Sequence, residues 1–145
     1  MNKIIDAKSK LKNPDILSIL SESIYMPNDE KLNHITNKYI INSRVLAYAY
    51  KNNSQFNGII ILEHLKNNEF EILNIAVSKE LQNNGIGKNL IDYIINNLNP
   101  HSLSAETDDD AINFYLKCGF KIIDRQEKYP GIIRYTCTHF SNFLK

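Results

Sequence analysis

A loop that carries two glycines, Gly85 and Gly87, has the composition of an anion-binding site. It follows an apolar run that ends at Val77 and leads directly into a stretch with helical periodicity. The first backbone N–H groups of a helix have no partners within the helix, and the helix dipole adds about half a positive charge there. Glycine also lets a phosphate approach the backbone, because it has no Cβ. Residues 82–88 are therefore predicted to bind an anion such as a phosphate.

Two well-known phosphate-binding motifs do not fit this loop. A Walker A loop needs a glycine five residues before the Gly-Lys pair and a serine or threonine after it, but the chain has Gln82 and Asn89 there. A dinucleotide-binding fingerprint would place its third small residue at Leu90, whose bulk would obstruct close packing of helix on strand. The remaining simple interpretation is that the two glycines only form a turn before a helix.

A second motif lies further along the chain and favours a specific family. The run Gln-x-x-Gly-x-Gly after Ile-Ala-Val, within residues 75–87, resembles the coenzyme A loop of the GNAT superfamily of acyl-CoA-dependent N-acetyltransferases. Residues 108–120 resemble the later helix of that family, with matches at Ala111, Tyr115 and the Gly119-Phe120 pair. The two motifs occur in the order and at the separation typical of the family, and the resemblance covers roughly residues 40–140.

The resemblance implies an α/β chain with a mixed sheet. The expected fold has three layers, in which a central, splayed, mostly antiparallel sheet is flanked by helices within one domain spanning residues 1–145. It also implies acetyl-CoA as co-substrate and an amine as acceptor. The pantetheine arm would lie in the splay, bonded to the main chain of Ile75, Ala76 and Val77, where an N–H group could polarise the thioester carbonyl.

The same resemblance places the pyrophosphate on the glycine loop. The backbone amides that would bind it belong to Gln82, Asn83, Asn84, Gly85, Ile86, Gly87 and Lys88. The Lys88 side chain is either a nearby counter-charge or a solvated lysine on a helix face, and the sequence favours neither.

Tyr115 is the residue to which the resemblance assigns proton transfer. When an amine attacks the thioester carbonyl, the departing sulfur needs a proton, and a phenol with a pKa near ~10 can supply it. The alternative is a core tyrosine whose ring packs beside Phe114 and Phe120.

Removal of a proton from the substrate ammonium requires a base, for which the sequence offers two candidates. Glu71 and Glu106 are expected on the two strands that flank the acyl end of the site. Either could act directly or through water, and both could equally be surface carboxylates. The base is therefore left unassigned.

Asp108 stands where the family often has an asparagine whose amide contacts the pantetheine arm. An ionised aspartate cannot donate that hydrogen bond, so a coenzyme contact at Asp108 stays open. We favour the interpretation that Thr107 or Asp108 caps the following helix, while Asp109 and Asp110 favour its positive end.

These motifs lie in a chain whose pattern predicts alternating helices and strands. Pro14 opens a first helix with apolar residues as far as Ile24, Pro27 ends it, and Asn28 starts a second, short helix. Strands are predicted at residues 44–50, 56–65, 70–77, 103–107, 120–123 and 132–140, and helices at about 85–98 and up to residue 118. The first two helices and the loop at residues 129–131 are expected to wall the acceptor side.

Composition limits the class of protein and its partners. A chain of 145 residues with 43% hydrophobic content forms one core but is too short for two ordinary domains. Its 17 Lys+Arg and 16 Asp+Glu nearly cancel, which argues against nucleic acid or an anionic membrane as a partner. The histidines show no metal-ligand spacing, so no metal site is predicted. Monomer and homodimer are both open.

A cytoplasmic location is expected from the cysteines and the start of the chain. Cys118 and Cys137 lie in apolar segments without a CxxC spacing, as reduced thiols do, and residues 1–10 lack the apolar stretch of a signal peptide. The predicted activity is transfer of acetyl to a primary amine of a small molecule or peptide. Two other classes stay open: a non-catalytic acyl-CoA-binding or regulatory module, and a small nucleotide-binding or protein-interaction domain.

Overall fold

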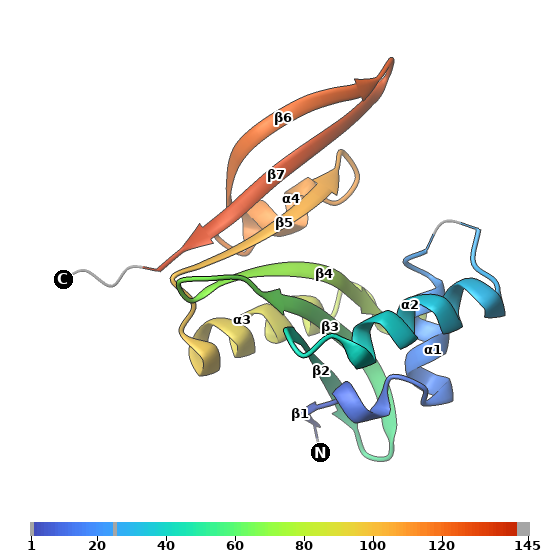
Figure 1. Cartoon of the computed structure of the whole chain (residues 1–145). Helices are drawn as coiled ribbons and strands as arrows, with labels where there is room; N and C mark the ends of the chain where they lie inside the picture. The colour runs from blue at the N-terminus through green and yellow to red at the C-terminus, as the bar shows by residue number, and fades with distance from the viewer. Residues whose placement is uncertain (1, 25, 142–145) are drawn as a thin grey trace.

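The computed structural model describes residues 2–24 and 26–141, which form three layers (Figure 1). A seven-stranded mixed sheet lies in the middle. Helices α1 (Pro14–Ser21) and α2 (Asp29–Ile41) cover one face, and α3 (Ile86–Leu98) and α4 (Ile112–Lys117) cover the other. The three-layer α/β architecture implied by the sequence is confirmed.

The sheet is antiparallel except at its centre. Its strands are β1 (Asn2–Asp6), β2 (Val45–Asn52), β3 (Gln55–His64), β4 (Glu69–Val77), β5 (Ser102–Asp108), β6 (Lys121–Tyr129) and β7 (Ile132–Phe140). They are ordered β1-β2-β3-β4-β5-β7-β6, and only the β4–β5 pair is parallel. The crossover between those two strands is α3, which makes the predicted βαβ unit.

Strand β3 separates two apolar cores, because successive side chains of a strand point to opposite faces. Ile60 and Leu62 pack on the side of α3, whereas Ile59 and Ile61 pack on the side of α1. Both cores therefore fix the position of β3, and through it the position of the neighbouring strand β4.

Helix α3 docks closely on the sheet through its predicted apolar stripe. The side chains that it buries are Ile86, Leu90, Ile91 and Ile94. A Cβ at Gly58 on β3 would lie 2.8 Å from Cγ2 of Ile86, so the close approach of the helix start requires a glycine there. The N-terminus of α3 is thereby held at a fixed place beside the end of β4.

The first two helices begin as predicted. The side chains of Asn13 and Asn28 accept hydrogen bonds from the N–H groups of Asp15 and Lys31, at 2.8 Å each. Helix α1 is shorter than predicted and does not reach Ile24. The N–H groups of Glu22 and Ser23 bond three residues back, to the Ile19 and Leu20 carbonyls, and this tightening ends the helix.

Two strands, β1 and β6, differ from the sequence-based prediction. The residues around Ile4, for which no strand was predicted, form an edge strand, β1, which pairs with β2. The predicted strand 120–123 continues to Tyr129, since its polar second half pairs with β7 despite having no apolar alternation. No helix in the described part of the chain is long and apolar enough to cross a lipid bilayer.

Candidate functional site

A cleft opens where β4 and β5 diverge. The two strands pair only between Glu69–Ile72 and Ser102–Ala105. Just beyond this pairing, β4 has a register shift against β3 at Leu73, of the kind that bends a strand. The cleft has a volume of about 910 Å³. Of the residues predicted for the site, it is lined by Ile75, Ala76, Val77, Gln82, Asn83, Gly85, Ile86, Gly87, Lys88, Asp108 and Tyr115.

The backbone of β4 presents free hydrogen-bonding groups to this cleft. Residues Asn74–Val77 pair with β3 on one side only. In an antiparallel pair, alternate residues direct their N–H and C=O groups away from the partner strand. The segment from Ile75 to Val77 can therefore bond to an extended ligand as to a further strand.

The start of α3 has the properties of an anion site. Gly85 is its N-cap residue with φ of +83°, in the left-handed region, and no side chain caps the helix within the described residues. The first N–H groups of α3 are therefore available, next to the positive end of the helix dipole. A Cβ at Gly85 would meet nothing within 4 Å, so the space beside the loop is open.

Asn84 does not line the cleft, although the sequence predicted it to bind coenzyme. Its amide nitrogen donates to the carbonyl oxygens of Leu81 and Gln82, at 3.1 and 3.3 Å. Gln82 similarly donates through Nε2 to the carbonyl oxygen of Val77, at 3.2 Å. These amide side chains hold the loop in shape between β4 and α3.

The space beside Gly87, unlike that beside Gly85, is occupied by a side chain. A Cβ at this position would lie 3.0 Å from both Cε1 and Cζ of Phe114 on α4. The absence of a side chain at Gly87 thus allows α4 to pack against the first turn of α3. The sequence had suggested a role in phosphate approach or in a simple turn before the helix.

The Lys88 ammonium forms an ion pair along its own helix. Its Nζ lies 2.8 Å from Oδ2 of Asp92, and both side chains are about half exposed. The hydrogen bond to Asp92 raises the pKa of Lys88. Of the two interpretations of Lys88, this geometry agrees with the exposed helix-face lysine, although the residue also lines the cleft.

Tyr115 is a buried residue that also reaches the cleft. Its ring is 6% exposed and packs edge-on against Phe114 and Phe120, with centroids 5.2 Å apart in each case. Its hydroxyl makes no hydrogen bond to any described residue, so it is available to a ligand. Burial, followed by the nearby Cys137, Cys118 and Asp108, raises the pKa of the phenol, which therefore stays protonated at neutral pH.

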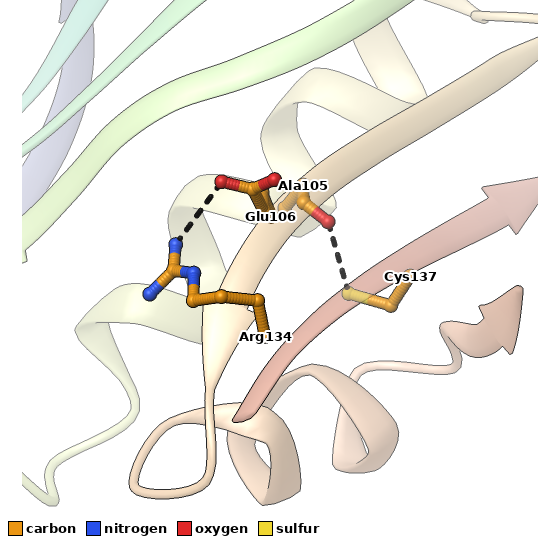
Figure 2. Close-up of polar contacts among 4 residues, drawn as sticks. All are labelled: Ala105, Glu106, Arg134 and Cys137. Atoms are coloured by element: carbon orange, nitrogen blue, oxygen red, sulfur yellow. Dashed lines mark hydrogen bonds and ion pairs between the residues drawn. The ribbon is translucent and has the colours of Figure 1, made fainter. Parts of the chain in front are cut away.

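The two candidate bases occupy different places. Glu106 lines the cleft, and its Oε1 lies 3.4 Å from Nη2 of Arg134, a pair that Figure 2 shows beside the Cys137 thiol. Glu71 is absent from the cleft lining. Burial and the carboxylates of Glu63 and Glu106 raise the pKa of Glu71.

The carboxylate of Asp108 binds the turn that leads into α4. Its Oδ1 accepts hydrogen bonds from the N–H groups of Asp110 and Ala111, at 3.1 and 3.0 Å. The helix itself begins only at Ile112, with Ala111 as its N-cap, so Asp108 caps the preceding turn and not the helix. Thr107 is buried on β5.

Arg134 and Cys118 are among the residues of the cleft lining that the sequence analysis did not assign to the site. Arg134 lies opposite Asp108 in the β5–β7 register and pairs with Glu106, a relationship that only the strand register could have revealed. Cys118 is half-buried in the cleft, and burial raises the pKa of its thiol. Both cysteines are free thiols. Within residues 2–24 and 26–141, no group of three or more His, Cys, Asp or Glu side chains could hold a metal ion.

Comparison with known proteins links this fold and cleft to one family. A family model described as the acetyltransferase (GNAT) domain matches residues 25–136. No curated protein sequence matches the chain significantly.

Solved structures share the fold along almost the whole chain. An IAA acetyltransferase from Bacillus cereus is 22% identical, with a TM-score of 0.70 over 97% of this chain and 99% of that one. A GNAT family acetyltransferase from Elizabethkingia anophelis, solved with acetyl-CoA bound, is 23% identical, with a TM-score of 0.71 over 96% and 97%. An aminoglycoside 6'-N-acetyltransferase from Enterococcus faecium is 14% identical, with a TM-score of 0.79 over 97% and 96%. Since the family model covers most of the chain, the protein belongs to the GNAT family of acetyltransferases.

Proposed function

We propose that the protein transfers an acetyl group from acetyl-CoA to a primary amine of a small molecule or peptide. The observation that carries this proposal is the composition of a single cleft. It contains the unpaired edge of β4, the uncapped start of α3 and Tyr115. These three features supply a place for an extended arm, for an anion and for a proton donor.

The cleft fits the parts of acetyl-CoA in order. The pyrophosphate would rest on the N–H groups at the start of α3, where Gly85 leaves open space. The pantetheine arm would follow the free edge of β4 from Val77 towards Ile75, and its thioester would then lie near Tyr115. Lys88 contributes to this site through its backbone N–H in the first turn of α3, while its ammonium is paired with Asp92 in solvent.

The reaction requires one bond to form and one to break. The nitrogen lone pair of the neutral amine attacks the thioester carbonyl carbon, the C–N bond forms, and the C–S bond breaks to release a thiolate. A backbone N–H of β4 stabilises the negative charge that develops on the carbonyl oxygen. Tyr115, protonated at neutral pH, donates a hydrogen bond to the leaving sulfur and finally its proton. The nitrogen is positively charged after the attack and loses its extra proton as the amide forms, and this proton returns through water to Tyr115.

Glu106 is the base that we assign to the acceptor amine. It lines the cleft, whereas Glu71 does not, and it lies on β5 two residues before Asp108. Arg134 lies 3.4 Å from it, and this pair holds the Glu106 carboxylate at the cleft. Glu106 takes the ammonium proton directly or through one water.

The residues that line the acceptor side of the cleft determine which amine can bind. The relatives named above differ in acceptor, IAA in one name and an aminoglycoside in another, so the shared fold does not select the acceptor. In this chain Glu22 and Ser23, after α1, line the acceptor side of the cleft. Such loop positions set specificity on a common scaffold.

A two-step experiment tests the proposal. The full chain is titrated with acetyl-CoA by calorimetry, and thiol release is then followed with polyamines, amino acids, aminoglycosides and lysine peptides. Saturable binding with amine-dependent release is the expected result. Binding with no release for any amine would instead support an acyl-CoA-binding module. Binding of ATP without binding of acetyl-CoA would overturn the assignment of the cleft.

A further inference from the structure

The ion pair between Glu106 and Arg134 lies on the face of the sheet opposite α3 and α4. Successive side chains of a strand point to opposite faces. Ala105 on β5 and Cys137 on β7 point into the core on the side of α3, so Glu106 and Arg134 point to the other face. The strand residues of the core beneath α1 and α2 belong to β2, β3 and β4. The ion pair therefore faces the cleft and not a helix.

Arg134 has hydrogen-bond donors that the protein does not use. Its Nη2 lies 3.4 Å from Oε1 of Glu106, which is its only side-chain hydrogen bond to a residue within 2–24 and 26–141. Figure 2 shows the side chain directed from β7 towards that carboxylate. A guanidinium is a planar fork of five N–H donors that pairs best with a carboxylate through two parallel bonds. The single long contact to Glu106 leaves this geometry available to an anionic group of a ligand.

Arg134 lies at the acceptor end of the cleft. The other basic side chains of the cleft lining are Lys88 and Lys117. Lys88 is in the first turn of α3, beside the proposed pyrophosphate site, and Lys117 ends α4 next to Cys118, which lies near Lys88. Arg134 instead contacts Glu106, the proposed base for the amine. An anion bound to Arg134 therefore belongs to the acceptor and not to the coenzyme.

We propose that Arg134 binds a carboxylate of the acceptor and that the acceptor is an α-amino acid. This assignment rests on the acetyl transfer proposed above. Because the two charged side chains are 3.4 Å apart, the ammonium at Glu106 and the carboxylate at Arg134 must be neighbours within one molecule. An α-amino acid meets this requirement, since its amino nitrogen and its carboxyl group share one carbon atom. Each charge of the ligand then faces an opposite charge of the protein.

Other classes of amine fit these two side chains less well. Polyamines and aminoglycosides have no carboxylate, and their further ammonium groups would be repelled by the fixed positive charge of Arg134. A lysine side chain within a peptide carries its amine far from any carboxylate of the backbone. All of these acceptors would leave the free donors of Arg134 without an anion.

Matched acceptors test this assignment in the full chain, with saturating acetyl-CoA and thiol release as the signal. Each α-amino acid of a panel is compared with its own amide, which keeps the amino group and the side chain but has no carboxylate. We expect kcat/KM of the best amino acid to exceed that of its amide by about tenfold or more, as for a charge-assisted hydrogen bond. The same assay includes polyamines and aminoglycosides.

Replacement of Arg134 by glutamine should remove the preference for the carboxylate. The ratio of kcat/KM for the acid to that for the amide should fall to about one, chiefly through a higher KM of the acid. Any disturbance of Glu106 affects both acceptors alike and cancels in the ratio. Arg125→Gln, which makes the same change at an exposed position of β6, is the matched control and should keep the wild-type ratio.

Two results would overturn the assignment. The first is a wild-type chain that acetylates amides, polyamines or aminoglycosides at least as well as any amino acid, a result that needs no variant. The second is an Arg134→Gln chain whose Tm equals that of wild type and whose acid-to-amide ratio is unchanged. Absence of thiol release with every amine is a different outcome, because it would remove the proposed acetyl transfer itself and with it this assignment.

Discussion

Gly87 on α3 and Phe114 on α4 pack closely together in the lining of the cleft, with the ring atoms 3.0 Å from the place where a Cβ of residue 87 would sit. This contact joins the two motifs that carry the family resemblance, because Gly87 belongs to the glycine loop and Phe114 precedes Tyr115. This packing interaction therefore links the position of the glycine loop to that of the helix that carries Tyr115, the proposed proton donor.

Replacement of Gly87 by alanine should disturb both parts of the site. The new Cβ must displace the Phe114 ring by a few tenths of an ångström. We expect the free energy of unfolding to fall by about 1 kcal/mol, and both acetyl-CoA affinity and kcat to decrease. Denaturant unfolding and calorimetry measure these effects. Asn89→Ala, at an exposed position of the same helix, is the control. Unchanged stability and kcat would show that the contact does not position the donor.

Tyr115→Phe removes the proposed donor while it keeps the ring that packs against Phe114 and Phe120. We expect kcat to fall by about 100-fold or more, because the leaving thiolate loses its proton source. Acetyl-CoA affinity and thermal stability should change little, since the hydroxyl bonds to no described residue. Tyr93→Phe, on α3 beside Tyr48, is the matched control. An unchanged kcat in Tyr115→Phe would remove this residue from the mechanism.

The coenzyme side of the site could be predicted from the sequence because it depends on local patterns. The glycine loop, the helix after it and the strand before it are contiguous, so their order alone predicts an anion site at residues 82–88, and all of these residues except Asn84 line the cleft. The acceptor side depends on strand register, which is not a local property. The pairing of Arg134 with Glu106 follows from the register of β5 and β7. The different placement of Glu71 and Glu106 follows from the point at which β4 and β5 diverge.

The difference between local sequence patterns and strand pairing also explains which strand ends could be predicted. Strands β2, β3 and β4 were predicted within a few residues because apolar runs mark them. The second half of β6 has no such mark, since both of its faces are exposed and it exists through backbone pairing with β7. Helix α4 starts late because Asp108 holds the turn before it, a detail of side-chain geometry.

Glu71 should make stability depend on pH. Its raised pKa means that the folded chain holds this proton more tightly than the unfolded chain. The resulting stabilisation is complete below the unfolded carboxyl pKa of about 4.3 and is lost as pH rises through the higher folded value. Glu71→Gln should therefore raise Tm at neutral pH, and this gain should disappear below a pH of about 4. Thermal unfolding at neutral pH and at a pH below about 4 measures this difference in Tm. Glu80→Gln, at an exposed position, is the control. A lower Tm at neutral pH would contradict the sign.

Glu106→Gln should remove the base from the acceptor side. We expect kcat/KM for the amine to fall by about 100-fold or more at neutral pH, where the acceptor is an ammonium that must lose a proton. The loss should shrink as pH approaches the amine pKa of about 10.4, because the amine then arrives neutral. A pH–rate profile at low amine concentration measures both effects. Glu71→Gln, outside the cleft lining, is the control, and a larger loss there than in Glu106→Gln would move the base to Glu71.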